Sequence, residues 1–171
     1  MKLTFVLRRP EKILVAKWFL FLTLLVPLTA VAADTPDEAA IRKIVDEQVV
    51  AWNVADGNAY AAHFAADGSF TNLFGMVMYG RAAFAKRHSD ILAGIYKHTT
   101  KKEIIQRIRF VTPDIAIVDI DNEIYGITAM PPGLTVPADG ILRTKLMQVF
   151  VKHQGEWWVE AYHNVDLKSP K

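Results

Sequence analysis

Cysteine is absent from this chain of 171 residues. Without it the protein can form no disulfide bond, thiol nucleophile or thiolate metal site. Histidine is scarce, and no two of the five histidines stand at His-x-His or His-x-x-x-His spacing. A metal site could still be assembled from distant residues, but no local pattern supports one. A glycine-rich phosphate loop is also missing. We therefore expect neither a metal nor a cofactor.

Long apolar runs are confined to the N-terminal region. Basic residues are scattered through positions 2–17, an apolar run follows at 18–26, and Pro27 and a tail of small residues come next. This order is typical of a secretory signal peptide, here with an Ala-x-Ala cleavage site at 30–32 or just beyond. A membrane anchor is the alternative, but a span needs about 20 uninterrupted apolar residues. We predict a signal peptide at 1–33, export to the periplasm or medium, and no membrane anchor after cleavage.

The positive charge of the chain belongs to this leader. The whole chain has a net charge of +2, and residues 1–33 carry five basic residues and one acidic residue. Residues 34–171 therefore carry a net charge of −2. No basic patch for nucleic acid remains, so we expect no nucleic-acid partner. The length of this segment suits one domain with a single core.

Three helices are predicted in the first half of this domain. Thr35 and Glu38 form a capping box for the first helix, and Asp56 is expected to cap a second, shorter one. A third helix runs from Arg81 to about Leu92. Helical spacing gives the expected inward-facing residues, which are Ile41, Ile44, Val45, Gln48 and Trp52 in the first helix, Tyr60 and Phe64 in the second, and Phe84, His88, Ile91 and Leu92 in the third.

Strands dominate the second half. Two short strands are expected at 69–74 and 76–79, and from Lys97 onward the apolar period changes to two. Four long strands follow, near 101–110, 115–125, 142–152 and 157–165, joined as a meander. In the first of the four, alternation places Ile104, Ile108 and Phe110 on the inner face and Lys101, Glu103, Arg107 and Arg109 on the outer face. Helices followed by an antiparallel sheet predict an α+β fold in which the helices cover one face of a curved sheet.

Several motifs in this order resemble the nuclear-transport-factor-2-like (NTF2-like) superfamily, and most closely its SnoaL-like, SgcJ/EcaC-type branch. They are Trp52, Asp56-Gly57, "HFAADGSFTN" at 63–72, Gly75, Gly80-Arg81, His88, "RFVTPDIAIV" at 109–118 and "GEWWVEAYHN" at 155–164. The resemblance covers essentially all of residues 34–171. It implies a cone-shaped half-barrel of about six strands on three helices, a deep apolar cavity, and a homodimer packed through the sheet. Functions within the superfamily range from isomerases and dehydratases to binding modules, so fold alone does not give the reaction.

Ketosteroid isomerase belongs to the same superfamily and provides a test. Its carboxylate base, oxyanion-binding tyrosine and protonated aspartate align with Asn72, Gln48 and Met147 of this sequence. An amide cannot take up a proton near neutral pH, and a thioether cannot donate a hydrogen bond. We therefore do not expect this protein to isomerise steroids.

A mainly apolar cup with a few polar groups is the predicted site. Alternation in the last two strands predicts that Trp157, Val159, Ala161 and His163, and opposite them Arg143, Lys145, Met147, Val149 and Val151, face the cup. The expected catalytic residues are His88, His163 and Asn72, because imidazole can carry a proton near neutral pH. The expected ligand-binding residues are Gln48, Trp52, Tyr60, Phe64, Phe70, Phe84, Lys145, Met147 and Trp157. Each polar residue also has a plainer interpretation, since His88 can bond a backbone carbonyl, Asn72 can anchor a loop and Lys145 can reach water.

Two functions follow from this cup. In the first, the exported domain binds a small hydrophobic oxygenated molecule and acts as an isomerase, dehydratase or hydrolase, with His88 or His163 as proton carrier. In the second, it is a non-catalytic dimeric module with a filled cavity, whose partner surface carries Ile105, Leu146, Gln148 and Phe150. The first is favoured, because burying a polar group without a partner costs about 1–3 kcal/mol of stability. A filled core would have no reason to contain the four polar residues expected here, Asn72, Gln48, His88 and His163.

Overall fold

A computed structural model describes residues 34–167, and the predicted signal peptide lies outside them. The elements are α1 (Pro36–Asn53), α2 (Gly57–Tyr60), β1 (Phe64–Thr71), β2 (Val77–Tyr79), α3 (Arg81–Ala93), β3 (Thr100–Thr112), β4 (Ile115–Tyr125), β5 (Ile141–His153) and β6 (Glu156–Asp166). The strands form one sheet in the order β2-β1-β6-β5-β4-β3. The pair β1–β6 is parallel and the other neighbours are antiparallel. The predicted α+β class, with a curved, unclosed sheet of six strands on three helices, is confirmed.

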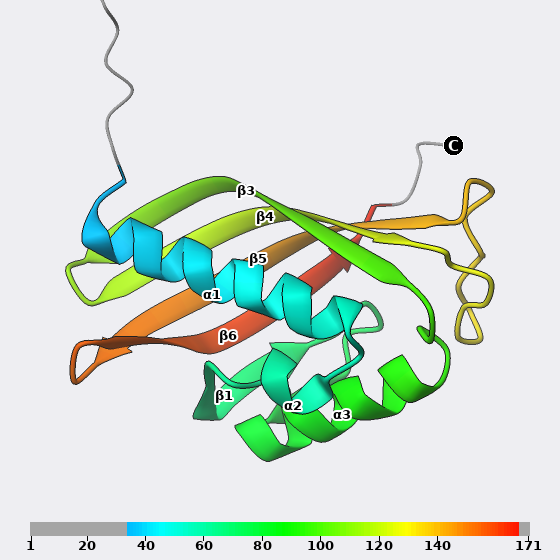
Figure 1. Ribbon diagram of the computed structural model, residues 1–171, viewed down its shortest axis with the longest axis horizontal. Coiled ribbons are helices and arrows are strands. Elements are labelled where there is room, and N and C mark those ends of the chain that lie inside the picture. Colours follow the sequence, from blue (N-terminus) through cyan, green and yellow to red (C-terminus); the bar gives the residue numbers. More distant parts are fainter. Residues whose placement is uncertain (1–33, 168–171) are drawn as a thin grey trace, which may run out of the picture. The chain divides into compact units, whose positions relative to one another are not determined.

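Helix α1 runs across the inner face of the long strands, and α2 and α3 lie beyond its C-terminal end, near β1 (Figure 1). The predicted capping box starts α1, with the Glu38 N–H donating to Thr35 Oγ1 over 3.2 Å and the Thr35 N–H donating to Glu38 Oε2 over 2.8 Å. The predicted stripe, Ile41, Ile44, Val45, Gln48 and Trp52, is buried. No helix within residues 34–167 is long and apolar enough to cross a membrane.

The α2–α3 junction is tight and fixes the position of the third helix. Asp56 Oδ1 accepts from the N–H groups of Asn58 and Ala59 at 3.0 and 2.9 Å, which confirms its predicted capping role. A Cβ at Gly57 would collide with the backbone nitrogen of Ser89 in α3. Glycine is therefore required for this approach. Because α2 ends at Tyr60, the prediction that Phe64 belongs to the same helix was wrong, and Phe64 instead begins β1 as a fully buried residue.

Bulges in β3 and in β6 reverse the side-chain alternation that the sequence predicts. In β3, Ile105 pairs with Ile120 and Arg107 with Asp119, so Gln106 is an extra residue. In β6, Val159 pairs with Phe150 and Ala161 with Val149, so Glu160 is an extra residue. An extra residue moves every following side chain to the other face. A strict period of two therefore cannot describe either strand.

The consequences of these bulges correct several predicted orientations. Before the bulge in β3, Lys101 and Glu103 face inward and Ile104 is 42 % exposed, contrary to prediction. After the bulge in β6, Tyr162 is buried and His163 is exposed, again contrary to prediction.

Strand β5 has no bulge within its pairing with β4, but its predicted face was also wrong. Val159 faces inward and pairs with Phe150, so the even-numbered residues of β5 share the inner face. These are Leu142, Thr144, Leu146, Gln148 and Phe150, all buried. Lys145 and Met147 therefore lie on the outer face, with Met147 39 % exposed. The partner surface expected for Leu146, Gln148 and Phe150 is likewise core.

Candidate functional site

A cavity of about 60 Å³ lies between α3, the inner face of the sheet and the turn after β1. Apolar side chains form most of its wall, together with a small number of polar ones. The lining residues are Trp52, Phe70, Asn72, Leu73, Phe74, Arg87, His88, Ile91, Ile95, Tyr96, Lys101, Asn122, Ile124, Pro131, Leu142, Tyr162 and Asn164. Since one buried water needs roughly 10–15 Å³ by this measure, the cavity holds about four waters or a molecule of similar size.

Asn72 lines this cavity and carries a donor without a partner in the described part of the chain. Its Oδ1 accepts from the N–H groups of Phe74 and Met76 at 2.9 and 3.0 Å. Backbone N–H groups can only donate, so these bonds fix the oxygen and leave Nδ2 as the remaining end of the amide. Asn72 is 8 % exposed, and Nδ2 has no hydrogen-bond partner within residues 34–167. Both interpretations of this residue therefore hold: it anchors the turn and it lines the cavity.

His88 presents a free acceptor. Its Nδ1 lies 2.8 Å from the carbonyl oxygen of Phe84, which can only accept, so Nδ1 carries the proton. Nε2 keeps its lone pair. Burial lowers the pKa of His88 to about 3, against a smaller opposing effect of the Phe84 bond, and the charges of Lys101 and Arg87 lower it further. His88 is therefore neutral at physiological pH.

Aromatic rings support His88 from behind. Its ring centroid lies 4.2 Å from that of Phe84 and 4.5 Å from that of Tyr60. Phe64 stacks on Phe84 with 4.0 Å between centroids. Among the predicted ligand-binding residues, Trp52 and Phe70 line the cavity directly, whereas Tyr60, Phe64 and Phe84 form the layer behind it. This packing holds the imidazole in one orientation.

The remaining predicted residues lie elsewhere. Gln48 Oε1 accepts from Gln148 Nε2 at 2.9 Å in the core and does not line the cavity. Trp157 is buried and donates from Nε1 to Asp37 at the start of α1 over 2.9 Å. His163, Lys145 and Met147 are on the outer face, as described above. The structure therefore brings His88, Asn72, Trp52 and Phe70 together and excludes the others from the cavity wall.

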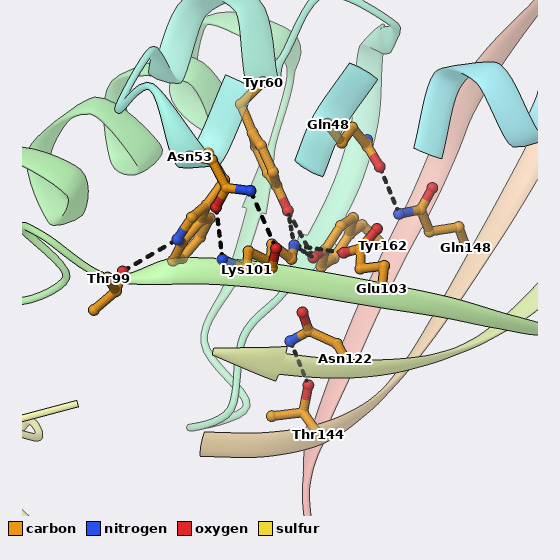
Figure 2. A network of polar contacts seen from close by, with 11 residues as sticks. Gln48, Asn53, Tyr60, Thr99, Lys101, Glu103, Asn122, Thr144, Gln148 and Tyr162 are labelled. Atoms are coloured by element: carbon orange, nitrogen blue, oxygen red, sulfur yellow. Dashed lines mark hydrogen bonds and ion pairs between the residues drawn. The ribbon is translucent and has the colours of Figure 1, made fainter. Parts of the chain in front are cut away.

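A buried charged cluster, whose contacts Figure 2 shows, contributes Lys101 and Tyr162 to the cavity wall and was not predicted from the sequence. Lys101 Nζ lies 2.5 Å from Glu103 Oε1, and the two side chains are 1 % and 0 % exposed. Nζ also donates to the hydroxyls of Tyr60 and Tyr162, the second over 3.3 Å. These hydroxyls lie 3.0 Å apart. Neither oxygen of Glu103 receives a well-directed hydrogen bond within residues 34–167, so the ion pair is its main compensation.

The cluster holds its groups in defined protonation states. Burial alone would lower the pKa of Lys101, but Glu103 and Tyr162 raise it above its usual value. Burial raises the pKa of both tyrosines, and the positive charge of Lys101 only partly opposes this for Tyr162. Lys101 is thus an ammonium, and both tyrosines keep their protons and can donate. Within the described residues no group of three histidine, aspartate or glutamate side chains could hold a metal ion.

Solved structures resemble this arrangement of elements. A cystatin-like-fold domain of unknown function from Nostoc punctiforme has a TM-score of 0.68 and 23 % identity, covering 80 % of this chain and 81 % of that one. An NTF2-like protein of unknown function from Shewanella oneidensis has a TM-score of 0.61 and 15 % identity, covering 75 % and 98 %. The domain has the NTF2-like fold. No family model and no curated protein matches the sequence.

Some structural neighbours with this fold carry the names of enzymes. A candidate scytalone dehydratase from Novosphingobium aromaticivorans has a TM-score of 0.64 and 20 % identity, covering 77 % of this chain and 85 % of that one. At such identities the similarity establishes the NTF2-like fold and leaves the chemistry to the residues themselves.

Proposed function

We propose that this NTF2-like domain binds a small, partly apolar molecule that carries a hydroxyl group and a carbonyl or carboxylate oxygen. A single observation supports this: one cavity is lined by two residues that each carry a polar atom without a partner within residues 34–167, the donor Asn72 Nδ2 and the acceptor His88 Nε2. Backbone partners fix the identity of both atoms. Buried polar groups without partners cost about 1–3 kcal/mol each, so a ligand that satisfies both gains affinity.

The cavity limits the size of this ligand. Pockets for drug-sized molecules measure about 300–1,000 Å³, whereas this one measures about 60 Å³. A compound with about four to six non-hydrogen atoms fills it. Pro131, from the segment between β4 and β5, forms part of the wall. The apolar residues Ile91, Ile124 and Leu142 suit the carbon skeleton of such a compound.

The state of His88 favours recognition over proton abstraction. A base whose pKa is about 3 has little driving force to take a proton from carbon at neutral pH. Its neutral Nε2 can instead accept a hydrogen bond from a ligand hydroxyl. We therefore assign His88 to binding.

Titration of the domain with acetoin, a C4 hydroxyketone, and lactate, a C3 hydroxy acid, tests this function. Binding can be followed by backbone amide NMR shifts around the cavity. Asn72→Leu and His88→Leu should each abolish the shifts, while the exposed control His163→Leu should leave them unchanged. Absence of shifts in the parent with both compounds would refute the proposal.

The small volume of the cavity favours a second candidate function, a non-catalytic homodimeric module. In that case the ligand titrations would fail while the domain formed a dimer through the outer face of its sheet, where Met147 and Val149 lie beside charged residues. Sedimentation of the domain with and without Met147→Glu would test this dimer.

Export and the SgcJ/EcaC-type relationship also belong to the proposal, and both rest on sequence motifs alone. Mass spectrometry of the protein recovered from cells that express the full chain would test export. We expect a product that begins near residue 33 or 34, outside the cytoplasm. A full-length cytoplasmic product would refute this part.

A further inference from the structure

The proposed function uses Asn72 and His88 but gives no role to the buried cluster of Lys101, Glu103, Tyr60 and Tyr162. This cluster is hard to explain by stability. Replacement of a buried ion pair by apolar residues of similar volume is often neutral or stabilising. Lys101 and Tyr162 nevertheless both line the cavity, and Nζ and the hydroxyl of these two residues lie 3.3 Å apart.

Counting protons shows what the cluster offers to the cavity. The ammonium of Lys101 has three protons; it donates to the hydroxyls of Tyr60 and Tyr162 and is ion-paired with Glu103. The two hydroxyls are in contact, so one donates to the other. When Tyr60 donates, the oxygen of Tyr162 accepts twice, and the proton of Tyr162 remains unused. The opposite arrangement leaves the unused proton on Tyr60, which is buried and does not line the cavity.

We propose that Lys101 and Glu103 act as positioning residues that turn the Tyr162 hydroxyl into a second donor for the cavity, which makes it selective for the carboxylate of a small hydroxy acid. This inference rests on the proposed function and deepens it. Two donors, Asn72 Nδ2 and the Tyr162 hydroxyl, match the two oxygens of a carboxylate. The hydroxyl of the ligand then binds His88 Nε2.

A further cationic group supports an anionic ligand. Arg87 is half-buried, lines the cavity and has no ion-pair partner within residues 34–167. The charge of Lys101 is offset by Glu103, whereas that of Arg87 is not. The cavity wall therefore carries net positive charge, which favours a carboxylate over a neutral carbonyl.

The test compares lactate with acetoin, which has a ketone in place of the carboxylate. We expect the parent domain to bind lactate about tenfold more tightly than acetoin, because hydrogen bonds to a charged group are the stronger ones. In Tyr162→Phe, lactate affinity should fall toward that of acetoin, leaving only the preference that the charge of Arg87 provides, and acetoin affinity should change little. In the parent, the Cζ resonance of Tyr162, observed in protein with ¹³C-labelled tyrosine, should move with lactate.

The positioning role has its own readout. The double variant Lys101→Met, Glu103→Leu retains the hydroxyl of Tyr162 but should lose the preference for lactate and the movement of the Cζ resonance. If this variant does not fold, Tyr162→Phe still decides the matter. A ratio of lactate affinity to acetoin affinity that Tyr162→Phe leaves unchanged would overturn the inference while the proposed function stands. Absence of binding by both compounds would overturn both.

Discussion

Two pairs of lysine and carboxylate lie on opposite faces of the same sheet and differ in almost every physical respect. On the inner face, the side chains of Lys101 and Glu103 are 1 % and 0 % exposed. On the outer face, those of Lys145 and Asp121 are 56 % and 36 % exposed. The inner lysine contacts two tyrosine hydroxyls and lies 5.0 Å from the ring centroid of Trp52. Within residues 34–167, the only partner of the outer lysine is its carboxylate.

The comparison shows that the contribution of an ion pair to stability depends on its burial. In water, charge attraction is screened and largely offset by the ordering of two long side chains, so exposed pairs contribute about 0–1 kcal/mol. In the core, each charge has lost its hydration, and either partner alone would be left uncompensated. Loss of one partner of the outer pair should therefore change stability little. In the inner pair, each charge needs the other as its counter-charge. The position of Lys101 in the cavity wall is the reason for proposing a role in recognition.

The largest expected effect follows from removing one partner of the inner pair. Lys101→Met leaves the Glu103 carboxylate buried without a counter-charge, and the free energy of unfolding should fall by about 3–5 kcal/mol. The matched control Lys145→Met should cost less than about 1 kcal/mol. Urea denaturation of the parent and both variants measures the two values. Equal losses in the two variants would refute the contrast between the faces.

Buried His88 extends the comparison to the way in which stability depends on pH. His88 has its pKa lowered from 6.5 to about 3 by burial, so the folded state stays neutral while the unfolded state takes up a proton below pH 6.5. The unfolded state then binds more protons, and stability is full above pH 6.5 and falls as the pH decreases toward 3.

Between pH 6.5 and 5 the loss from His88 should be about 2 kcal/mol. His88→Leu should flatten this part of the stability profile, and the exposed control His163→Leu should leave it unchanged. Chemical denaturation at half-unit pH intervals gives the curves. A profile that is the same in the parent and in His88→Leu would contradict the assignment of a buried neutral imidazole.

A smaller effect is expected for the amide that anchors the turn. Asn72→Leu removes two hydrogen bonds to the N–H groups of Phe74 and Met76, and should cost about 1–2 kcal/mol. Asn58→Leu, on the exposed surface of α2, is the control and should change stability by less than about 0.5 kcal/mol. Thermal unfolding of both variants measures the difference. A cost for Asn72→Leu no greater than that of the control would mean that these bonds do not hold the turn.

Local signals in the sequence were sufficient for the first and third helices and for the order of the strands along the chain. The capping box at Thr35 and Glu38 and the helical spacing that ends in Trp52 fixed α1, because both arise from contacts within a few residues. His88 and Asn72 were also found this way. Each is a polar residue on an otherwise apolar face, which a single periodicity reveals.

The bulges at Gln106 and Glu160 were not predictable, and the wrong faces predicted for Lys101, Glu103 and His163 follow from them. Each extra residue is an ordinary polar side chain with no local signature, since a bulge depends on how two strands pair. Because Lys101 and Glu103 are charged, they were predicted to face the solvent, where such residues nearly always lie. Tyr162 was assigned to the outer face because the bulge at Glu160, which precedes it in β6, was not predicted. Placing these three residues inside requires the register of the sheet, which periodicity does not contain.

The smallest expected change comes from removing both inner charges together, and it separates the two explanations of the cluster. Lys101→Met combined with Glu103→Leu leaves neither charge uncompensated, so stability should return to within about 1 kcal/mol of the parent or exceed it. Urea denaturation of the double variant beside Lys101→Met measures the recovery. Because stability would then be indifferent to the pair, its presence beside the cavity would need a reason in ligand recognition. A double variant as unstable as Lys101→Met would instead show that the ion pair is a structural element of the core.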